Sequence, residues 1–452
     1  MKETKFKQTE VGMIPCDWEV KSVGQLTNVL TGFPFPGNTI LENGNVRLLR
    51  GVNITEGQIR HSDDIDRFYS GNIESLREYA LREDDLVIGM DGSKVGKNSA
   101  IIHKNESGNL LVQRVARLRV KNSKQPISYL FYFISSNNFI AYIDSLKTNS
   151  AIPHISPADI RNYTIPLPSK IEEQQRIANA FSDVDSLINN LEKLIAKKKN
   201  VKQGAMQQLL TGKKRLPGFG SDERTGSRPT DERRRECHSE RSAKREVEES
   251  NGYKMTELGL IPSDWEVKKV GSIGKIITGS TPPRGDSTLW NGTFCWLSAQ
   301  DFKQKNIFNS VEKISELGKK YCRLLPKDSV LVTCIASIGL NAISRVECAT
   351  NQQINAIVCN DKNNPNYIYY AIEMRSDDLK VLAGQTAVPI VNKEQFENFE
   401  LILPSKAEQT AIANVLSDMD TEISALETKL AKYRTLKTGM MQQLLTGKIR
   451  LV

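Results

Sequence analysis

The sequence predicts an α+β protein with two α/β domains, separated by two long helices that form an antiparallel coiled coil with pseudo-two-fold symmetry. Three observations predict this fold class. The chain repeats one frame twice, each copy ends in a long heptad pattern, and each interior alternates short strand signals with turns. The chain has 452 residues, of which 39% are hydrophobic, so it is long enough for several domains with cores of their own.

The internal repeat is clearest where each copy begins and ends. Residues 7–24 (KQTEVGMIPCDWEVKSVG) and 254–271 (KMTELGLIPSDWEVKKVG) agree at 13 of 18 positions. Residues 204–216 (GAMQQLLTGKKRL) and 439–451 (GMMQQLLTGKIRL) agree at 11 of 13 positions. The interiors have diverged. Ordinary drift after a duplication would explain this, but the contrast in identity favours a shared frame with two interiors that do different jobs.

Each copy ends in a segment that predicts a helix of about 40 residues. Apolar residues recur at steps of four and three, which is the spacing of a coiled-coil seam. Pro168 and Pro404 exclude helix upstream, while Gly212 and Gly447 are typical of helix ends. Neither helix can bury its seam alone, so the two should pack on each other. The seam residues are Ile177, Phe181, Val184, Ile188, Leu191 and Ile195, and Ile412, Leu416, Met419, Ile423, Leu426 and Leu430.

The two copies also follow each other cyclically. The block TGKKRL leads through a linker to the segment LGLIPSDW, and the block TGKIRL would lead in the same way to VGMIPCDW near the beginning of the chain. We therefore expect the two termini to lie near each other. The linker is predicted from residues 221–250, which hold 8 Lys or Arg and 9 Asp or Glu and too few apolar side chains to form a core.

The interiors show strand signals at 45–52, 85–90 and 110–120 in the first copy and at 293–298, 329–335 and 354–358 in the second, with helical segments at 127–135 and 366–374. Their loops are rich in Arg, Lys, Asn and Gln, which suit guanine edges, adenine edges and phosphates. The net charge of +9 is a weak indication of a polyanionic partner. The candidate DNA-binding residues are Arg47, Arg50, Asn53, Lys94, Lys97, Arg114, Ser280, Thr281, Arg284, Gln300, Lys303 and Gln352.

Catalytic chemistry is not indicated. The segment GSKVGK at 92–97 lacks the glycine spacing of a phosphate loop, and the four His residues have no counterparts in the other copy. The seven Cys residues lack metal-site spacing, which predicts free thiols and no metal site. No apolar run is long enough to cross a bilayer, and the start of the chain has no signal-peptide pattern, so we expect a cytoplasmic protein without a membrane partner.

The repeated frame resembles that of the DNA-specificity (S) subunit of type I restriction–modification systems. The shared features are two xIPxDWEVK segments, two divergent interiors and two helices that end in QQLLTGKxRL. The stretch TGSTPPRGDSTLWNGTFCWLSAQDF at 278–302 is similar to the start of that family's target recognition domains. NQQINAIV at 351–358 and GQTAVPIVN at 384–392 resemble its later motifs. The resemblance covers nearly the whole chain, and the charged linker departs from it.

This resemblance implies a non-catalytic subunit that recognises double-stranded DNA. Each recognition domain would read one half of a bipartite, asymmetric target. The helices would set the spacing and dock two methyltransferase (M) subunits, which restriction/translocase (R) subunits can join. S-adenosylmethionine, and ATP with Mg²⁺, would bind those partners, and this chain would hold no cofactor. The alternatives are a coiled-coil protein-binding scaffold without a DNA role and, disfavoured by the missing cofactor loop, a stand-alone DNA-modifying enzyme.

The same resemblance predicts five segments along the chain. They are a first target recognition domain at 1–168, a first conserved helical spacer at 169–216, a charged flexible linker at 217–253, a second target recognition domain at 254–404 and a second conserved helical spacer at 405–452.

Overall fold

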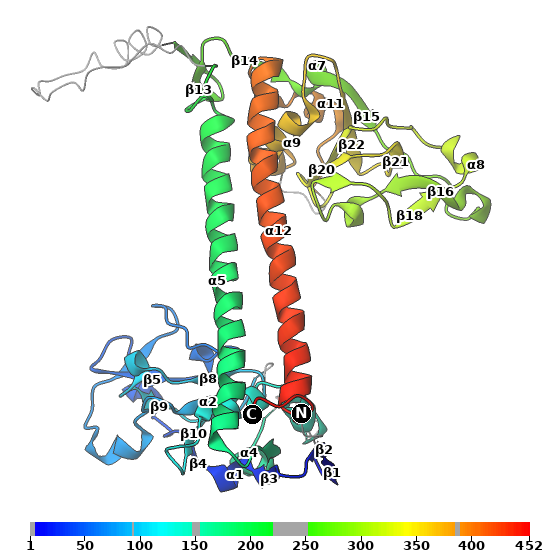
Figure 1. Ribbon diagram of the computed structural model, residues 1–452. Helices are drawn as coiled ribbons and strands as arrows, with labels where there is room; N and C mark the ends of the chain where they lie inside the picture. The colour runs from blue at the N-terminus through cyan, green and yellow to red at the C-terminus, as the bar shows by residue number, and fades with distance from the viewer. Residues whose placement is uncertain (1–4, 93–94, 147–153, 220–251, 385–388) are drawn as a thin grey trace, which may run out of the picture. The chain divides into compact units, whose positions relative to one another are not determined.

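The computed structural model describes residues 5–92, 95–146, 154–219, 252–384 and 389–452. The chain divides into two compact units. The first unit is Met1–Glu192 with Thr428–Val452, and the second is Lys193–Glu427. Each unit therefore contains one predicted recognition domain together with one part of each long helix (Figure 1). Most of the predicted linker lies outside the described residues.

The first unit is built on a four-stranded antiparallel sheet in the order β4-β10-β7-β8. It also contains a three-stranded sheet in the order β6-β5-β9. Two strand pairs, β1-β2 and β11-β3, form the frame. The strands are β1 (Phe6–Thr9), β2 (Gly12–Pro15), β3 (Glu19–Ser22), β4 (Thr27–Thr31), β5 (Val46–Leu49), β6 (Arg67–Tyr69), β7 (Leu86–Gly89), β8 (Ser99–Ile101), β9 (Leu110–Leu111), β10 (Val115–Val120) and β11 (Thr164–Leu167). The helices are α1 (Val23–Leu26), α2 (Ile127–Ile134), α3 (Asn137–Leu146) and α4 (Pro157–Asn162).

The second unit repeats this topology with one added strand. Its main sheet has the order β15-β22-β19-β20-β17, its smaller sheet is β18-β16-β21, and its frame pairs are β12-β13 and β14-β23. The strands are β12 (Tyr253–Thr256), β13 (Gly259–Pro262), β14 (Glu266–Lys269), β15 (Gly274–Thr278), β16 (Trp290–Leu297), β17 (Asn306–Ile307), β18 (Glu312–Ile314), β19 (Val330–Thr333), β20 (Asn341–Ser344), β21 (Cys348–Thr350), β22 (Ile354–Cys359) and β23 (Glu400–Leu403). The helices are α7 (Val270–Ile273), α8 (Glu316–Lys319), α9 (Pro365–Met374), α10 (Ser376–Leu382) and α11 (Lys393–Asn398).

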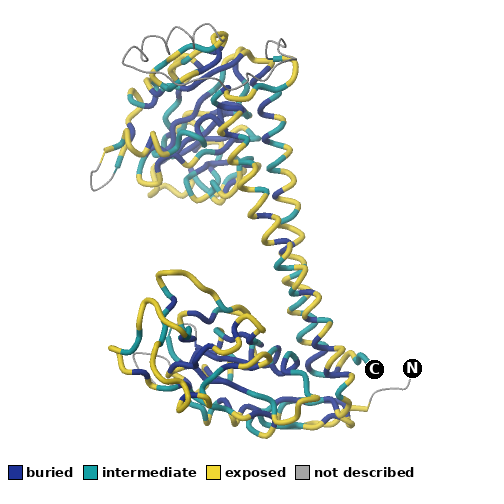
Figure 2. Tube along the Cα trace, turned by 90° about the vertical axis from the view of Figure 1, so that its left-hand side faces the viewer, coloured by how far each residue is buried: buried dark blue, intermediate teal, exposed yellow. Residues whose placement is uncertain are grey.

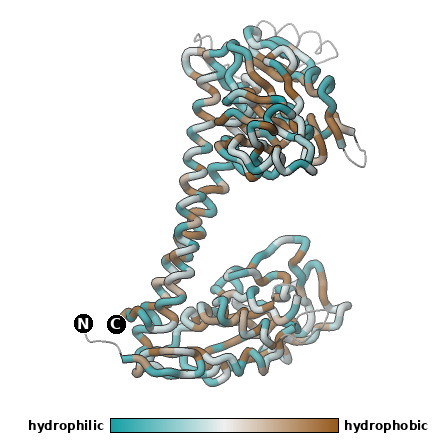
Figure 3. Tube along the Cα trace, turned by 90° about the vertical axis from the view of Figure 1, so that its right-hand side faces the viewer, coloured by the Kyte–Doolittle hydropathy of each residue, from teal (hydrophilic) through white to brown (hydrophobic). Residues whose placement is uncertain are grey.

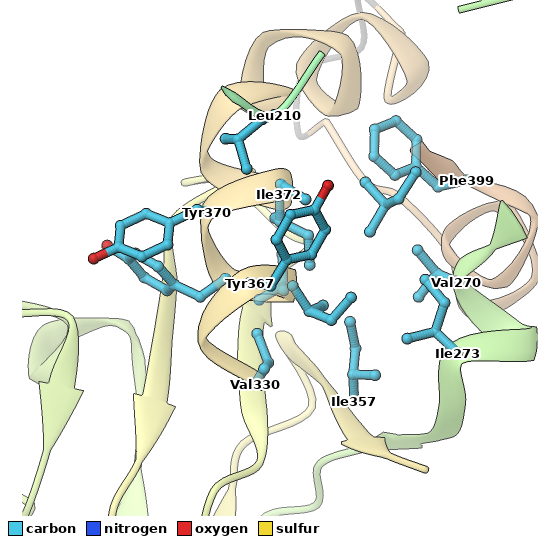
Figure 4. Packing of buried hydrophobic residues seen from close by; sticks show 14 of the residues in the cluster. Leu210, Val270, Ile273, Val330, Ile357, Tyr367, Tyr370, Ile372 and Phe399 are labelled. Atoms are coloured by element: carbon cyan, nitrogen blue, oxygen red, sulfur yellow. The ribbon is translucent and has the colours of Figure 1, made fainter. Parts of the chain in front are cut away.

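A tyrosine-rich helix joins each sheet to the frame. In the second unit, α9 packs over strands β19 and β22, and Tyr367 lies between Val330, Ile357 and Phe399 (Figure 4). Its hydroxyl donates to the carbonyl oxygen of Ile402 at 2.9 Å. In the first unit, α2 occupies the same place, and burial is concentrated along the central strands of each domain (Figure 2). The predicted mixed α/β interior with a partly antiparallel sheet is therefore confirmed.

Two uninterrupted helices of 39 residues each carry the heptad pattern: α5 (Ile171–Leu209) and α12 (Lys406–Leu444). Hydrophobic and hydrophilic positions alternate along both (Figure 3). All twelve predicted seam residues are buried or half-buried. Those nearest the start of each helix, such as Phe181 and Leu416, belong to the cores of the recognition domains. The first turns of each long helix therefore pack against a recognition domain as well as against the other helix.

Ion pairs show that the two helices run antiparallel within each unit. In the first unit, Arg434 pairs with Glu192 at 2.6 Å, and Lys437 pairs with Asp185 at 2.6 Å. In the second unit, Lys202 pairs with Asp420 at 2.7 Å. The residue numbers rise on one helix as they fall on the other, which confirms the predicted antiparallel coiled coil.

The repeated frame forms a crossed lock that confirms the predicted cyclic arrangement. In the first unit, Arg450 from the end of the chain bonds Asp17 through two nitrogens, both at 2.9 Å, and Glu173 at 2.5 and 2.7 Å. Its guanidinium lies 5.6 Å from the ring centre of the buried Trp18. Near the terminus, Arg176 donates to the carbonyl oxygen of Leu451 at 3.4 Å. The ends of the described chain therefore lie together.

The second unit contains the same lock, closed by the end of the first copy. Arg215 bonds Asp264 at 2.8 and 2.9 Å and Glu408 at 2.6 and 2.9 Å, and it lies 5.9 Å from the ring centre of Trp265. The indole nitrogen of Trp265 also donates to Glu408 at 3.0 Å. Each IPxDW segment is thus held by the TGKxRL block of the other copy, which explains why these two blocks are the parts of the frame that match best.

Glycine at the end of each long helix is required by both conformation and space. Gly212 has φ +72°, and a Cβ added there would lie 2.4 Å from Cδ of Pro262. Gly447 has φ +69° and would meet Pro15 at 2.5 Å. The left-handed conformation ends the helix, and the missing side chain lets the IPxDW segment approach. Both residues act as the predicted helix stops.

We expect Gly212→Ala to destabilise the second unit by about 2 kcal/mol or more, because left-handed strain of about 1–2 kcal/mol adds to the displacement of Pro262. Gly204→Ala is the matched control. Gly204 lies within α5 with nothing within 4 Å of an added Cβ, so alanine there should stabilise the helix by roughly 0.5–1 kcal/mol. Denaturant unfolding of both variants measures the difference. Equal effects of the two substitutions would contradict the role of Gly212.

Candidate nucleic-acid interface

The first unit has a polar hollow at the ends of β5 and β10. Its volume is about 620 Å³, and its lining includes the predicted residues Arg50 and Arg114. Arg114 has φ +66° in the turn before β10, and its side chain is 67% exposed. Its Nη1 donates to Oδ2 of Asp91 at 3.0 Å. The fold therefore brings together an arginine and an aspartate that are 23 residues apart. The other lining residues are Ile40, Gly51, Val52, Gly92, Asn98, Val112 and Gln113.

Asn53 and Arg47 both interact with the buried Asp66. Asn53 is fully buried, and its amide donates to Oδ1 of Asp66 at 2.9 Å and to the carbonyl oxygen of Arg60 at 3.3 Å. Direct contact of Asn53 with a base is therefore incompatible with this conformation, and we correct its role to positioning the loop. Arg47 is half-buried, with Nε 3.4 Å from Asp66 and its guanidinium 5.6 Å from the ring centre of Phe68.

Two predicted lysines belong to the loop between β7 and β8. Lys97 is exposed, beside the hollow residue Asn98. Lys94 lies outside the described residues. Arg50 is half-buried, and its Nη1 lies 3.5 Å from the carbonyl oxygen of Ile65. Of the predicted residues in the first unit, Arg50 and Arg114 line the hollow, and Lys97 is the sequence neighbour of a third lining residue, Asn98.

In the second unit, Arg284 lies over two indole rings. Its guanidinium is 4.0 Å from the ring centre of Trp290 and 4.9 Å from that of Trp296, and Nη2 donates to Glu312 at 3.1 Å. The hydrogen bond with Glu312 raises the pKa of Arg284, and the same bond lowers the pKa of the Glu312 carboxyl. A hollow of about 520 Å³ adjoins these residues and includes Lys313. Sequence reasoning singled out Arg284 but neither its aromatic support nor Glu312.

The remaining predicted residues of the second unit fall into two groups. Thr281 donates from its hydroxyl to Oε1 of the exposed Gln352 at 2.6 Å, although 71 residues separate them. Gln300 and Lys303 are also exposed. Ser280 serves the fold instead, because its Oγ accepts from the backbone nitrogen of Arg323 at 3.1 Å and its carbonyl oxygen accepts from the indole of Trp296 at 3.1 Å.

A second contact between frame and domain was missed by sequence reasoning. In the first unit, the hydroxyl of Tyr132 donates to Asp185 at 3.1 Å, and Lys437 lies 5.6 Å from the centre of the same ring. In the second unit, Tyr370 bonds Asp420, and Lys202 lies 5.3 Å from its ring centre. Lys305 joins this second cluster through Tyr370 at 2.7 Å, and burial lowers the pKa of Lys305 to about 8. The tyrosine ties the domain to both helices of the unit.

Across the described ranges, no group of three or more His, Cys, Asp or Glu residues is arranged to hold a metal ion. Within the same ranges, no helix combines the length and the apolar character needed to span a bilayer. The six cysteines that the structure describes are free thiols, and Cys237 lies outside these ranges.

Comparison with known proteins identifies the family. The sequence model of the type I restriction modification DNA specificity domain matches residues 15–203 and 262–432. The putative type I restriction enzyme MjaX specificity subunit of Methanocaldococcus jannaschii is 26% identical over 99% of this chain and 97% of its own length. The MjaVIII specificity subunit of the same organism is 24% identical over 99% and 97%.

Solved structures agree on the fold. The type I restriction–modification S subunit from M. genitalium aligns with a TM-score of 0.58 at 14% identity over 98% of both chains. A chain from a study of complex assembly and conformational transition of the type I R-M system aligns with a TM-score of 0.51 at 14% identity, over 96% of this chain and 99% of that one. With two family matches that together cover most of its length, this chain belongs to the DNA specificity subunits of type I restriction–modification systems, which recognise DNA and are not catalytic.

Proposed function

We propose that the recognition domain of each unit reads one half of a bipartite, asymmetric target in double-stranded DNA. The observation that carries this proposal is the combination of a repeated frame with different polar side chains at several equivalent positions. Arg50 and Ser298 both precede the short 3₁₀ helix that follows the central strand of the smaller sheet. Arg114 directly precedes β10 and Gln353 directly precedes β22, which are the second strands of the two main sheets. Unlike side chains on one scaffold favour unlike half-sites.

The candidate residues divide by chemistry. Exposed cations at a hollow suit phosphates and guanine edges, and exposed amides suit adenine edges. We propose Arg50, Lys97, Arg114, Arg284, Lys303, Gln300 and Gln352 as contacts to DNA, and Arg47, Asn53, Ser280 and Thr281 as residues that position them. Lys94, outside the described ranges, stays a prediction for the same loop.

The conserved helices would set the distance between the half-sites and dock two methyltransferase subunits, to which restriction/translocase subunits add. Support comes from the length and continuity of α5 and α12 and from the near identity of their terminal blocks. S-adenosylmethionine and ATP with Mg²⁺ would be bound by those partners, and the complex would act on DNA in the cytoplasm. We propose the corresponding division of the chain into recognition domains at 1–168 and 254–404, helical spacers at 169–216 and 405–452, and a charged linker at 217–253.

Exchange of one recognition domain tests this function. Residues 17–168 are replaced by those of another specificity subunit, and methylated adenines are mapped genome-wide with the complete complex. We expect one half of the methylated sequence to change and the other half and the gap to stay the same. The unexchanged second domain is the internal control. An unchanged methylated sequence would contradict DNA reading by the first domain and favour the coiled-coil scaffold.

A further inference from the structure

The turn before strand β10 in the first unit is structurally equivalent to the turn before strand β22 in the second unit. In the first unit, the backbone nitrogen of Gly32 donates to Val115 at 3.0 Å, and Met90 donates to Arg114 at 2.9 Å. In the second unit, Gly279 donates to Ile354 at 3.0 Å, and Cys334 donates to Gln353 at 2.8 Å. A Cβ on either glycine would meet the carbonyl oxygen of the turn, at 2.2 Å for Gly32 and 2.1 Å for Gly279. Residues 112–114 and 351–353 therefore hold the same position. The middle residue is glutamine in both turns, whereas Val112 and Arg114 of the first unit correspond to Asn351 and Gln353 of the second.

In the first unit, this turn presents an arginine that is already oriented. The positive φ of Arg114 directs its side chain from the tip of the turn, and Oδ2 of Asp91 accepts one of its hydrogen bonds at 3.0 Å. One acceptor occupies only one of the five N–H donors, so the rest of the guanidinium remains available. Guanine offers O6 and N7 as two acceptors in the major groove, which match a guanidinium better than the edge of any other base.

In the second unit, the same turn presents an oriented amide. Oε1 of the exposed Gln352 accepts from the hydroxyl of Thr281 at 2.6 Å. The second lone pair of this oxygen and both N–H donors of the amide remain available. Adenine offers a donor at N6 and an acceptor at N7, which is the pattern that one glutamine amide satisfies. Gln353, by contrast, has its Oε1 engaged with the amide of Asn351 at 3.3 Å.

We propose that Arg114 reads a guanine in the half-site of the first unit and that Gln352 reads an adenine in the half-site of the second. Asp91 and Thr281 are positioning residues, which reduce the conformational freedom that the reading side chains lose on binding. This inference rests on the proposed function and deepens it, because it assigns one base in each half-site to one side chain. It also explains how equivalent turns specify different bases.

The test uses the complete complex and the substitutions Arg114→Gln and Gln352→Arg. Methylated sites are mapped genome-wide, and DNA binding is measured on targets in which each base of both half-sites is changed in turn. For Arg114→Gln, we expect one guanine of the first half-site to be replaced by adenine and the affinity for the original site to fall roughly 5- to 150-fold. For Gln352→Arg, we expect the reverse change at one position of the second half-site.

Arg77→Gln is the matched control in the first unit. Arg77 is likewise an exposed arginine paired with a carboxylate, Glu74, but both lie in the 3₁₀ helix Glu74–Tyr79, away from the turn. Its substitution should leave the target unchanged. Asp91→Asn and Thr281→Val should keep the original target while lowering the preference for the one base that each supports. Arg114→Lys keeps the positive charge but loses the two-point contact, so it should also weaken the preference for guanine.

Two outcomes would overturn the inference. If Arg114→Gln weakens binding equally for every sequence and Arg114→Lys restores it, Arg114 contacts phosphate. If neither Arg114→Gln nor Gln352→Arg changes the target, both side chains have surface roles only. In either case, exchange of residues 17–168 still reports on the proposed function, since a changed half-site in that experiment leaves DNA reading intact.

Discussion

Arg450→Met is expected to destabilise the first unit by about 3–5 kcal/mol, because it leaves a buried carboxylate without its partner. Glu173 is only 2% exposed, and its pairing with Arg450 places both carboxylate oxygens within 2.7 Å of guanidinium nitrogens. The methionine side chain fills most of the volume that Arg450 occupies beside Trp18, but it carries no charge. Hydrogen exchange in strands β2 and β3 should accelerate by roughly two to three orders of magnitude, which mass spectrometry of these peptides measures.

Arg434→Met provides the control for the loss of an arginine as such. Arg434 pairs with Glu192, but both side chains are exposed, at 60% and 42%, so the cost should stay below about 1 kcal/mol. Adding Glu173→Gln to Arg450→Met should recover part of the stability, because it removes the unpaired charge. Equal losses from Arg450→Met and Arg434→Met would show that the lock contributes no more than a surface ion pair.

The second large effect concerns the gap between the half-sites. Four helix-forming residues inserted into both α5 and α12 add about 6 Å to each helix, which corresponds to one or two base pairs of DNA. We expect methylation to move to sites with the longer gap, while both half-sites keep their sequences. Insertion between Glu192 and Lys193 and between Glu427 and Thr428 leaves the interior of each compact unit unchanged. Genome-wide mapping of methylated adenines measures the gap.

A seven-residue insertion at the same two places tests the geometry further. Seven residues preserve the heptad phase, whereas four shift it. They add about 10 Å, so the gap should grow by about three base pairs. Methylation that stays on the original gap in both variants would refute the idea that the helices act as a ruler. If all methylation is lost, exchange of one recognition domain in the same insertion variant distinguishes a failure of the ruler from misfolding of the protein.

Sequence reasoning succeeded where one local pattern determines structure. The heptads of α5 and α12 and the glycine stops at Gly212 and Gly447 depend on neighbouring residues, and the structure confirms them. The order of the repeated blocks predicted that the two termini lie near each other, but it did not predict the crossed lock itself. Its arginines were not singled out, although the R of TGKxRL and the D of IPxDW both recur in the two copies.

The candidate site was predicted less well, because its contacts join residues that are distant in the sequence. Asn53 belongs to a loop rich in polar side chains, yet burial against Asp66 occupies its amide. The pairing of Asp91 with Arg114 depends on strands β7 and β10 lying side by side, which only the folded sheet reveals. Polar composition selected these loops as candidates, but it could not separate side chains that face solvent from those that support the loop.

The crossed lock also determines when the protein can finish folding. The bond between Arg450 and Asp17 joins residues 433 positions apart, so this contact cannot form until the ribosome has synthesised residue 450. Closing such distant contacts is slow compared with local ones. Until then, Trp18 and its neighbours stay accessible to chaperones and proteases. We expect nascent chains stalled shortly before residue 450 to be cleaved near the IPCDW segment, and released full-length chains to be protected there.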